Sequence, residues 1–220
     1  MQKKRRSFVV VGLGDFGGTV ATALAAMGNE VLGIDTDDRR ARQHIDKVTH
    51  VVIADARDED ALREAGAGHH DVAVISIGED LEASILCTMN LKLIGVQTIW
   101  VKALSRTHHR ILAKLGVDRV NRPEHDMGLH ISEMLHTPFV GDYLSLGNGF
   151  HVINLIMPES SKLTKIADLH SAAGSNITIL GMMRGTEFVS ANDLEASLVE
   201  GDRLMLLGRR DALRQLAGVL

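Results

Sequence analysis

The chain has little cysteine, little proline and few aromatic residues. Its 220 residues include one Cys and three Pro, and aromatic residues make up only 3%. A single Cys excludes a disulfide scaffold and any zinc or redox site built on two cysteines. The low proline content and the absence of low-complexity tracts are typical of a folded chain and not of a disordered one.

Neither sign of charge dominates the composition. The chain has 24 Lys and Arg against 28 Asp and Glu, which gives a formal net charge of −4. This argues against a generic nucleic-acid binder, because such proteins are usually strongly basic. At about 100–200 residues per domain, the length predicts one large domain or two small ones.

Long apolar runs are also missing. The longest uncharged stretch, residues 143–158, is interrupted by glycines and polar residues, whereas a membrane span needs about 20 mostly apolar residues. The basic residues 3–6 precede an apolar run that ends at Gly12, short of the roughly 7–15-residue core of a signal peptide. We therefore expect a cytoplasmic protein that reaches a membrane only through a partner.

Strand and helix patterns alternate regularly over about the first 120 residues. Short apolar runs, typical of strands buried on both faces, are separated by segments of helical periodicity. The expected strands are residues 7–11, 30–35, 50–54, 71–77, 98–101 and 117–121. The expected helices are one ending near Gly28, residues 37–46, one capped by Asp58, residues 81–93 and residues 107–115. This rhythm predicts an α/β fold with a Rossmann-like, doubly wound parallel sheet.

The pattern changes after a helix that Pro123 opens and that ends by Pro138. Consecutive strands are then expected at residues 151–157, 177–183, 187–189 and 203–207, with short helices at 163–169 and 211–219. This predicts a small α+β domain. The predicted domains are residues 1–137 and 138–220, with a linker at about 138–149, where Gly141, Gly147 and Gly149 cluster.

A glycine-rich loop follows the first expected strand and opens a helix. Gly12, Gly14 and Gly17 fit the G-x-G-x-x-G pattern, and Asp35 ends the next strand, which makes the pattern specific. In this pattern the first glycine permits a tight turn, the second lets phosphate approach the backbone, and the third lets helix and strand pack closely. The candidate residues of the loop and of the second strand's end are Gly12, Leu13, Gly14, Asp15, Phe16, Gly17, Asp35 and Thr36.

The pattern predicts a site for an adenosine phosphate. Free N–H groups and the helix dipole hold the phosphate, and Asp35 can accept hydrogen bonds from ribose hydroxyls while it repels a 2′-phosphate, which disfavours NADP. AMP, ADP, ATP and NAD all contain an adenosine phosphate, so the pattern does not distinguish among these four ligands. Asp55 lies at the end of the third strand and Ile77, Gly78 and Glu79 lie at the end of the fourth, where they either frame the adenine or are ordinary loop residues.

No catalytic arrangement is recognisable. Residues 138–220 contain histidines and arginines, but the chain has neither an H-E-x-x-H nor a G-x-S-x-G motif. Cys87 lies within an apolar helix pattern, which favours packing over a nucleophilic role. We therefore expect a nucleotide sensor and not an enzyme, with an NAD-dependent oxidoreductase or an NAD(H)-binding redox sensor as the alternative.

With these features in view, the sequence resembles the RCK (KTN) family, and within it the cytosolic regulatory subunits of Ktr/Trk-type potassium uptake systems. The resemblance covers essentially the whole chain. Beyond the glycine loop it rests on residues 75–78 with 83–84, 99–103, 122–128 and 200–208. The segment 122–128 is the most specific of these, because ordinary dehydrogenases lack it.

The resemblance implies a gating function in potassium transport. Such subunits form octameric rings, tetramers of dimers, which bind a dimeric membrane subunit that conducts K⁺. They are therefore peripheral proteins on the inner face of the membrane. ATP or ADP occupies each Rossmann lobe, and the difference between the two changes the shape of the ring and biases the channel.

The resemblance also assigns individual residues. Asp55 and Ala56 fall where the family contacts adenosine, and Lys102 points toward the nucleotide crevice. Glu124 matches a glutamate that helps relatives hold a divalent cation, Mg²⁺ or Ca²⁺, between the γ-phosphates of facing ATP molecules. From the residue alone, Glu124 is a favourable carboxylate in the first turn of a helix.

One residue departs from the family pattern. Ktr-type relatives often carry Arg between the second and third glycines, aimed at the terminal phosphate, whereas this chain has Asp15. A carboxylate near a γ-phosphate is repulsive unless a cation bridges the two. We therefore expect a weaker preference for ATP, or a stronger dependence on Mg²⁺ or Ca²⁺. The second domain of some relatives binds cyclic di-AMP, but residues 166–169 and 176–178 carry no motif strong enough to predict it here.

Overall fold

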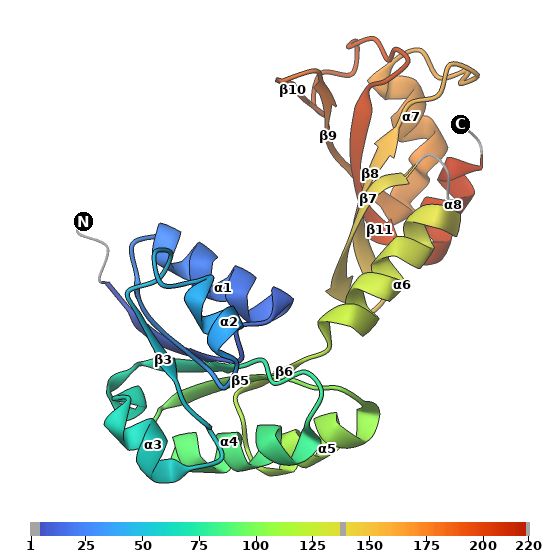
Figure 1. Cartoon of the computed structure of the whole chain (residues 1–220). Helices are drawn as coiled ribbons and strands as arrows, with labels where there is room; N and C mark the ends of the chain where they lie inside the picture. Colours follow the sequence, from blue (N-terminus) through green and yellow to red (C-terminus); the bar gives the residue numbers. More distant parts are fainter. Residues whose placement is uncertain (1–4, 137–139, 219–220) are drawn as a thin grey trace. The chain divides into compact units, whose positions relative to one another are not determined.

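The computed structural model describes residues 5–136 and 140–218, and the chain divides into two compact units, Met1–Pro123 and Glu124–Leu220. The first unit contains a six-stranded sheet and the second a five-stranded sheet (Figure 1). The predicted boundary between residues 137 and 138 lies outside the described residues. The helix α6 (Pro123–His136), which that boundary placed in the first domain, falls almost entirely in the second unit.

The first sheet is parallel throughout and has the order β3-β2-β1-β4-β5-β6. Its strands are β1 (Ser7–Val11), β2 (Glu30–Asp35), β3 (His50–Ile53), β4 (Val72–Ile75), β5 (Thr98–Lys102) and β6 (Arg119–Asn121). The order reverses between β1 and β4, as in a doubly wound Rossmann-like sheet. The predicted fold class is thereby confirmed.

Helices cover both faces of this sheet. They are α1 (Asp15–Ala26), α2 (Asp38–Arg42), α3 (Glu59–Glu64), α4 (Leu81–Leu93) and α5 (Arg106–Lys114), with a short 3₁₀ turn at Ala67–His69. In Figure 1, α1 and α2 lie on one side of the sheet and α3, α4 and α5 on the other. Strand β1 serves both cores, because Phe8 and Val10 pack in one apolar cluster and Val9 and Val11 in the other. The continuous apolar run at residues 8–11 reflects this two-sided burial.

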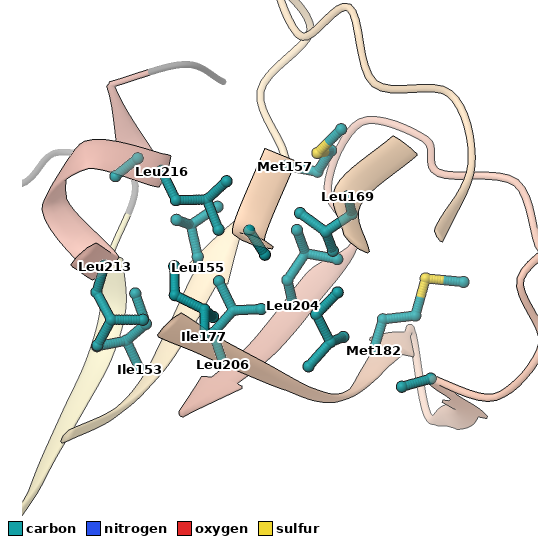
Figure 2. Packing of buried hydrophobic residues seen from close by; sticks show 14 of the residues in the cluster. Ile153, Leu155, Met157, Leu169, Ile177, Met182, Leu204, Leu206, Leu213 and Leu216 are labelled. Carbon is teal, nitrogen blue, oxygen red and sulfur yellow. The ribbon is translucent and has the colours of Figure 1, made fainter. Parts of the chain in front are cut away.

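The second sheet is antiparallel, in the order β10-β9-β11-β8-β7. Its strands are β7 (Val140–Gly147), β8 (Phe150–Ile156), β9 (Ile177–Arg184), β10 (Glu187–Ser190) and β11 (Arg203–Arg209), and the helices after α6 are α7 (Ile166–Ala173) and α8 (Arg210–Ala217), with a 3₁₀ turn at Gly174–Asn176. Figure 2 shows its single core, in which Leu155, Leu204 and Leu206 from the sheet meet Leu169 and Leu216 from the helices. Among the described residues, helix α6 has none that is fully buried.

The segment predicted as a linker at about 138–149 is mostly strand β7, and this prediction was wrong from residue 140 onward. Strand β7 pairs with β8 and returns through Gly147, Asn148 and Gly149, whose φ angles are 84°, 52° and 78°. Three successive residues in the left-handed region form a tight hairpin turn, which glycine and asparagine tolerate best. Residues 138 and 139 lie outside the described residues.

The described ranges also bear on membrane insertion. None of the helices within residues 5–136 and 140–218 combines the length and the apolar character that a bilayer crossing requires.

Candidate nucleotide-binding site

The predicted site residues of the first unit lie at one edge of its sheet. Gly12 follows β1, Asp35 ends β2, Asp55 follows β3, Ile77 follows β4 and Lys102 ends β5. Because all six strands are parallel, their carboxyl ends meet at the same edge. Ligands of such sheets bind where the strand order reverses, which here is beside β1 and β4.

The three glycines of the loop meet three different environments. Gly12 has a φ of +88°, and a Cβ atom there would lie 2.8 Å from the carbonyl oxygen of Ser76. A Cβ atom at Gly17 would collide with the carbonyl oxygen of Gly12. At Gly14, by contrast, the structure places one atom beyond the chain neighbours within 4 Å of an added Cβ among the residues it describes: Nη1 of Arg40, at 4.0 Å. Gly12 and Gly17 are therefore required for the loop to fold, whereas Gly14 faces open space.

Helix α1 begins without a side-chain cap. In the described part of the chain, α2, α3, α4 and α5 begin with side chains that accept backbone N–H groups, from Asp37, Asp58, Asp80 and Ser105. The corresponding position of α1 is Gly14, which has no side chain to accept them. The first N–H groups of a helix need an acceptor, and a phosphate at this position supplies one.

Asp35 is a buried anchor between two loops. Its side chain accepts a hydrogen bond from the Leu13 amide at 2.7 Å and another from the Asp37 amide at 2.8 Å, and the residue is 6% exposed. The carboxylate thus joins the glycine loop to the loop before α2. An ionised carboxylate offers about four acceptor positions, so two such bonds leave acceptor capacity for the ribose hydroxyls predicted to bind here. Thr36, the next residue, is exposed.

The loop after β3 is fixed by two side chains. Arg57 binds Asp55 through Nε and Nη2, with a closest approach of 2.6 Å, and this hydrogen bonding is the main cause that lowers the pKa of Asp55. Asn90 of α4 donates its amide to the carbonyl oxygens of Ala56, at 3.2 Å, and Arg57, at 2.8 Å. Asp55 and Ala56 therefore stand in a preformed loop, with Asp55 partly exposed and Ala56 buried.

Lys102 brings three predicted site segments together. Its Nζ lies 5.8 Å from the centre of the Phe16 ring, a distance at which a cation and an aromatic face attract each other. A Cβ atom at Gly78 would lie 3.8 Å from the same Nζ. The end of β5, the glycine loop and the loop after β4 thus converge at this ammonium group. Ile77 is half-buried, whereas Glu79 and Asp15 are exposed.

Glu124 lies on a different element from the predicted loop residues. It lies in the first turn of α6, in the second unit, and it is exposed. Among the residues that the structure describes, no group of three or more His, Cys, Asp or Glu side chains could hold a metal ion. The role of Glu124 in a cation site shared between subunits stays a prediction.

Two residues near the loops were not singled out from the sequence. Arg40 approaches Gly14, and Asn90 clamps the loop after β3. The three arginines of α2, shortly after Asp35, were a signal for Arg40. Asn90 is a lone Asn inside an apolar helix, and nothing in the sequence indicated the loop that it binds. Cys87 is fully buried and burial raises its pKa, so the expectation that it packs in the core is confirmed.

The fold and the glycine loop define the class of Rossmann-like proteins. A family profile described as the TrkA-N domain matches residues 8–123. The chain is 32% identical over 212 residues to the Ktr system potassium uptake protein A of Bacillus subtilis (strain 168), with 96% of each chain covered. It is 31% identical over 213 residues to the protein of the same name from Vibrio alginolyticus, with 97% of each covered. The chain belongs to the TrkA-N (RCK) family.

Solved structures agree on the fold. The structure titled "GsuK channel bound to NAD" superposes with a TM-score of 0.67 at 13% identity, covering 100% of this chain. This chain spans only 40% of the length of that one. A second structure, "Shewanella denitrificans Kef CTD in AMP bound form", has a TM-score of 0.50 at 26% identity and covers 59% of this chain and 80% of its own.

Proposed function

We propose that this chain is a nucleotide-binding regulatory subunit of a potassium transport system. The observation that carries the nucleotide site is Gly14, which leaves the N-terminus of α1 uncapped and open beside the fixed carboxylate of Asp35. The relatives named as Ktr system potassium uptake proteins, which are similar over nearly the whole chain, support the potassium transport system.

The ligand that we propose is ATP or ADP. The glycine loop and Asp35 suit an adenosine with one or more phosphates. The titles of two fold relatives name NAD and AMP, which both contain an adenosine phosphate. NAD(H) is therefore the second candidate ligand, either for a redox-sensing regulator or for an oxidoreductase. We favour regulation over catalysis because the similar full-length relatives are named for potassium uptake.

The regulatory step is a shift between conformations and not a reaction. A nucleotide moves such an equilibrium only if it binds one conformation more tightly than the other. We propose that the chain assembles into dimers and an octameric ring on a dimeric membrane subunit, and that ATP and ADP favour different shapes of that ring. The chain would then lie at the inner face of the membrane through this partner.

Two acidic residues make the proposed site dependent on cations. Asp15 is exposed in the first turn of α1, beside the position of the phosphates, and we propose that Glu124 contributes to a Mg²⁺ or Ca²⁺ site between subunits. We expect Asp15→Arg to raise the affinity for ATP relative to ADP, because it replaces a repulsive charge with an attractive one. An unchanged ATP:ADP ratio would contradict the role given to Asp15.

The deciding experiment is calorimetric titration of the nucleotide-free protein with ATP, ADP and NADH, each with and without Mg²⁺. Tight binding of ATP and ADP with weak binding of NADH is the expected result. A matched control is Gly14→Val, whose side chain would occupy the open space where the phosphate approaches. Tight binding of NADH with weak binding of ATP would instead favour the redox sensor or the oxidoreductase.

A further inference from the structure

The three arginines of α2 differ in their partners. The Arg39 guanidinium lies 3.7 Å from the carboxylate of Asp37, and Arg42 binds Asp38 at 2.7 Å. Within the described ranges, the guanidinium of Arg40 takes part in no ion pair or hydrogen bond. The amide of Arg39 contributes most to the lowered pKa of Asp37, and the charge of Arg40 helps to lower it. Over the residues that the structure describes, the Arg40 guanidinium makes no direct pair with that carboxylate and can still bind a ligand.

The guanidinium of Arg40 lies close to Gly14 of the glycine loop. Its Nη1 atom lies 4.0 Å from the place where a side chain at Gly14 would begin, and no other described residue beyond the two chain neighbours of Gly14 comes within 4 Å of that place. This is the space that the second glycine of the motif leaves for a phosphate. A phosphate oxygen that approaches the Gly14 backbone therefore comes within reach of the guanidinium, which is well suited to phosphate because its donors form a planar fork.

A phosphate bound at the glycine loop would be repelled by a nearby carboxylate, and a cation would offset that repulsion. Asp15 places a carboxylate in the first turn of α1, where a phosphate would meet a negative charge. Lys102 places a first cation near the loop, with its Nζ 5.8 Å from the centre of the Phe16 ring. Arg40 is thus a second cation at the phosphate position, contributed by α2 and not by the glycine loop.

We propose that Arg40 binds the 5′-phosphate of the adenine nucleotide and so offsets the repulsion from Asp15. This rests on the proposed function and adds to it the residue that recognises the phosphate. A 2′-phosphate would offer the same chemistry, but it would lie beside the carboxylate of Asp35, whose charge repels it. The ligand class is therefore adenosine 5′-phosphates, with Arg40 contributing to phosphate affinity and not to recognition of the base.

The test compares Arg40→Gln with Arg39→Gln, a matched control on the same helix whose side chain is 88% exposed and paired with Asp37. Binding of 5′-AMP and 2′-AMP is measured by calorimetry, and binding of adenosine by nuclear magnetic resonance titration, on the full-length protein. We expect Arg40→Gln to weaken 5′-AMP binding about tenfold or more, as for loss of a hydrogen bond between charged groups. Adenosine binding should stay within about twofold, and Arg39→Gln should change neither.

Other results would overturn the proposal. Equal 5′-AMP affinity in the two variants would show that Arg40 does not bind the phosphate, and equal loss for adenosine would show that it acts on the nucleoside or the loop. A loss confined to 2′-AMP would assign Arg40 to that phosphate instead. If the unaltered protein bound AMP, ADP, ATP and NADH no better than Gly14→Val does, the proposed function itself would fail. Equal melting temperatures of the ligand-free variants control for unfolding.

Discussion

The two units of this chain bury their sheets in different ways. In the first unit, successive residues of β1 pack alternately in two apolar clusters, one on each face of the parallel sheet. In the second unit, Ile153 and Leu155 of β8 enter one core, while Phe150 and Ile156 on the same strand are 43% and 39% exposed. Parallel sheets are generally covered on both faces, whereas antiparallel sheets need only one.

This difference predicts which substitutions each unit tolerates without loss of stability. In the first unit, the glycine loop is packed backbone against backbone, as at Gly12 and Gly17. In the second unit, a buried side chain fixes the loop that precedes β11. Asp202, which is 1% exposed, accepts hydrogen bonds from Arg184 and from the Val199 amide.

The largest effect is expected from Gly17→Ala in the first unit. The added methyl group would collide with the carbonyl oxygen of Gly12, so we expect the free energy of unfolding to fall by about 3 kcal/mol, as in severe overpacking. The matched variant Gly14→Ala meets open space and should cost less than about 1 kcal/mol, because its φ of −67° suits alanine. Urea unfolding followed by the fluorescence of Trp100, the only Trp, reports on this unit. Equal losses in the two variants would contradict the packing argument.

A smaller loss is expected when a buried carboxylate of the second unit is removed. Burial raises the pKa of Asp202, but hydrogen bonds from Arg184 and Val199 outweigh it and hold the pKa below its ordinary value. We expect Asp202→Ala to destabilise the protein by about 2 kcal/mol, less than for a fully buried pair because the Arg184 side chain is 41% exposed. Hydrogen exchange at Val199 should rise with it. The exposed pair Lys165 and Glu195 provides the control, since Glu195→Ala should cost less than about 1 kcal/mol.

Mild acid should weaken both units through one histidine each. Burial lowers the pKa of His108 in the first unit and of His151 in the second. The folded state therefore disfavours the protonated ring, and stability that is present above about pH 6.5 declines as the pH falls below that value. Urea midpoints at pH 7.5, 6.5 and 5.5 measure this decline.

A variant separates the two histidines. His151 stacks on Tyr143 with ring centres 4.6 Å apart, and His151→Phe keeps a ring there without a titrating group. Hydrogen exchange in the second unit should then lose most of its pH dependence below pH 6.5 beyond the intrinsic exchange rate, while the first unit keeps the dependence that His108 causes. An unchanged profile in the second unit would show that His151 is not its source.

The smallest effects are expected on the surface, where the two units should not differ. Arg63 binds Glu59 in the first unit and Lys165 binds Glu195 in the second, and all four side chains are at least 36% exposed. Arg63→Gln and Lys165→Gln should each leave the urea midpoint of unfolding almost unchanged, because exposed ion pairs contribute little to stability. High salt should remove even this small effect on unfolding stability. A larger loss of stability in one unit would mean that its ion pair is shielded from water.

The comparison also explains how much the sequence could predict. Strands β1 and β2 and helix α4 begin and end at the predicted residues, because two-sided burial leaves unbroken apolar runs and Asp80 marks the start of α4. Strand β7 was missed because it is an edge strand with most of its side chains exposed, so its pattern resembles a loop. Its Gly141 lies in the strand, against Ile156, and does not mark a linker.

The candidate site was predictable to a similar extent. The motif placed Gly12, Gly14, Gly17 and Asp35 at one edge of the sheet, since the glycine spacing and the alternation of strands with helices can be read from the local sequence. The run of arginines after Asp35 indicated a cation near the site, but which of them approaches Gly14 depends on how α2 packs over the sheet, which the sequence does not specify locally. The hydrogen bonds of Asn90 to the loop after β3 span more than thirty residues and were hidden for the same reason.

The two hydrogen bonds that hold Asp35 have a consequence for binding entropy. A free aspartate gives up rotamer freedom when a ligand orders it, and that loss weakens binding. Here the amides of Leu13 and Asp37 already fix the carboxylate, so the entropic penalty falls on folding and not on association. A ribose that reaches this edge of the sheet meets an acceptor that is preorganised for it.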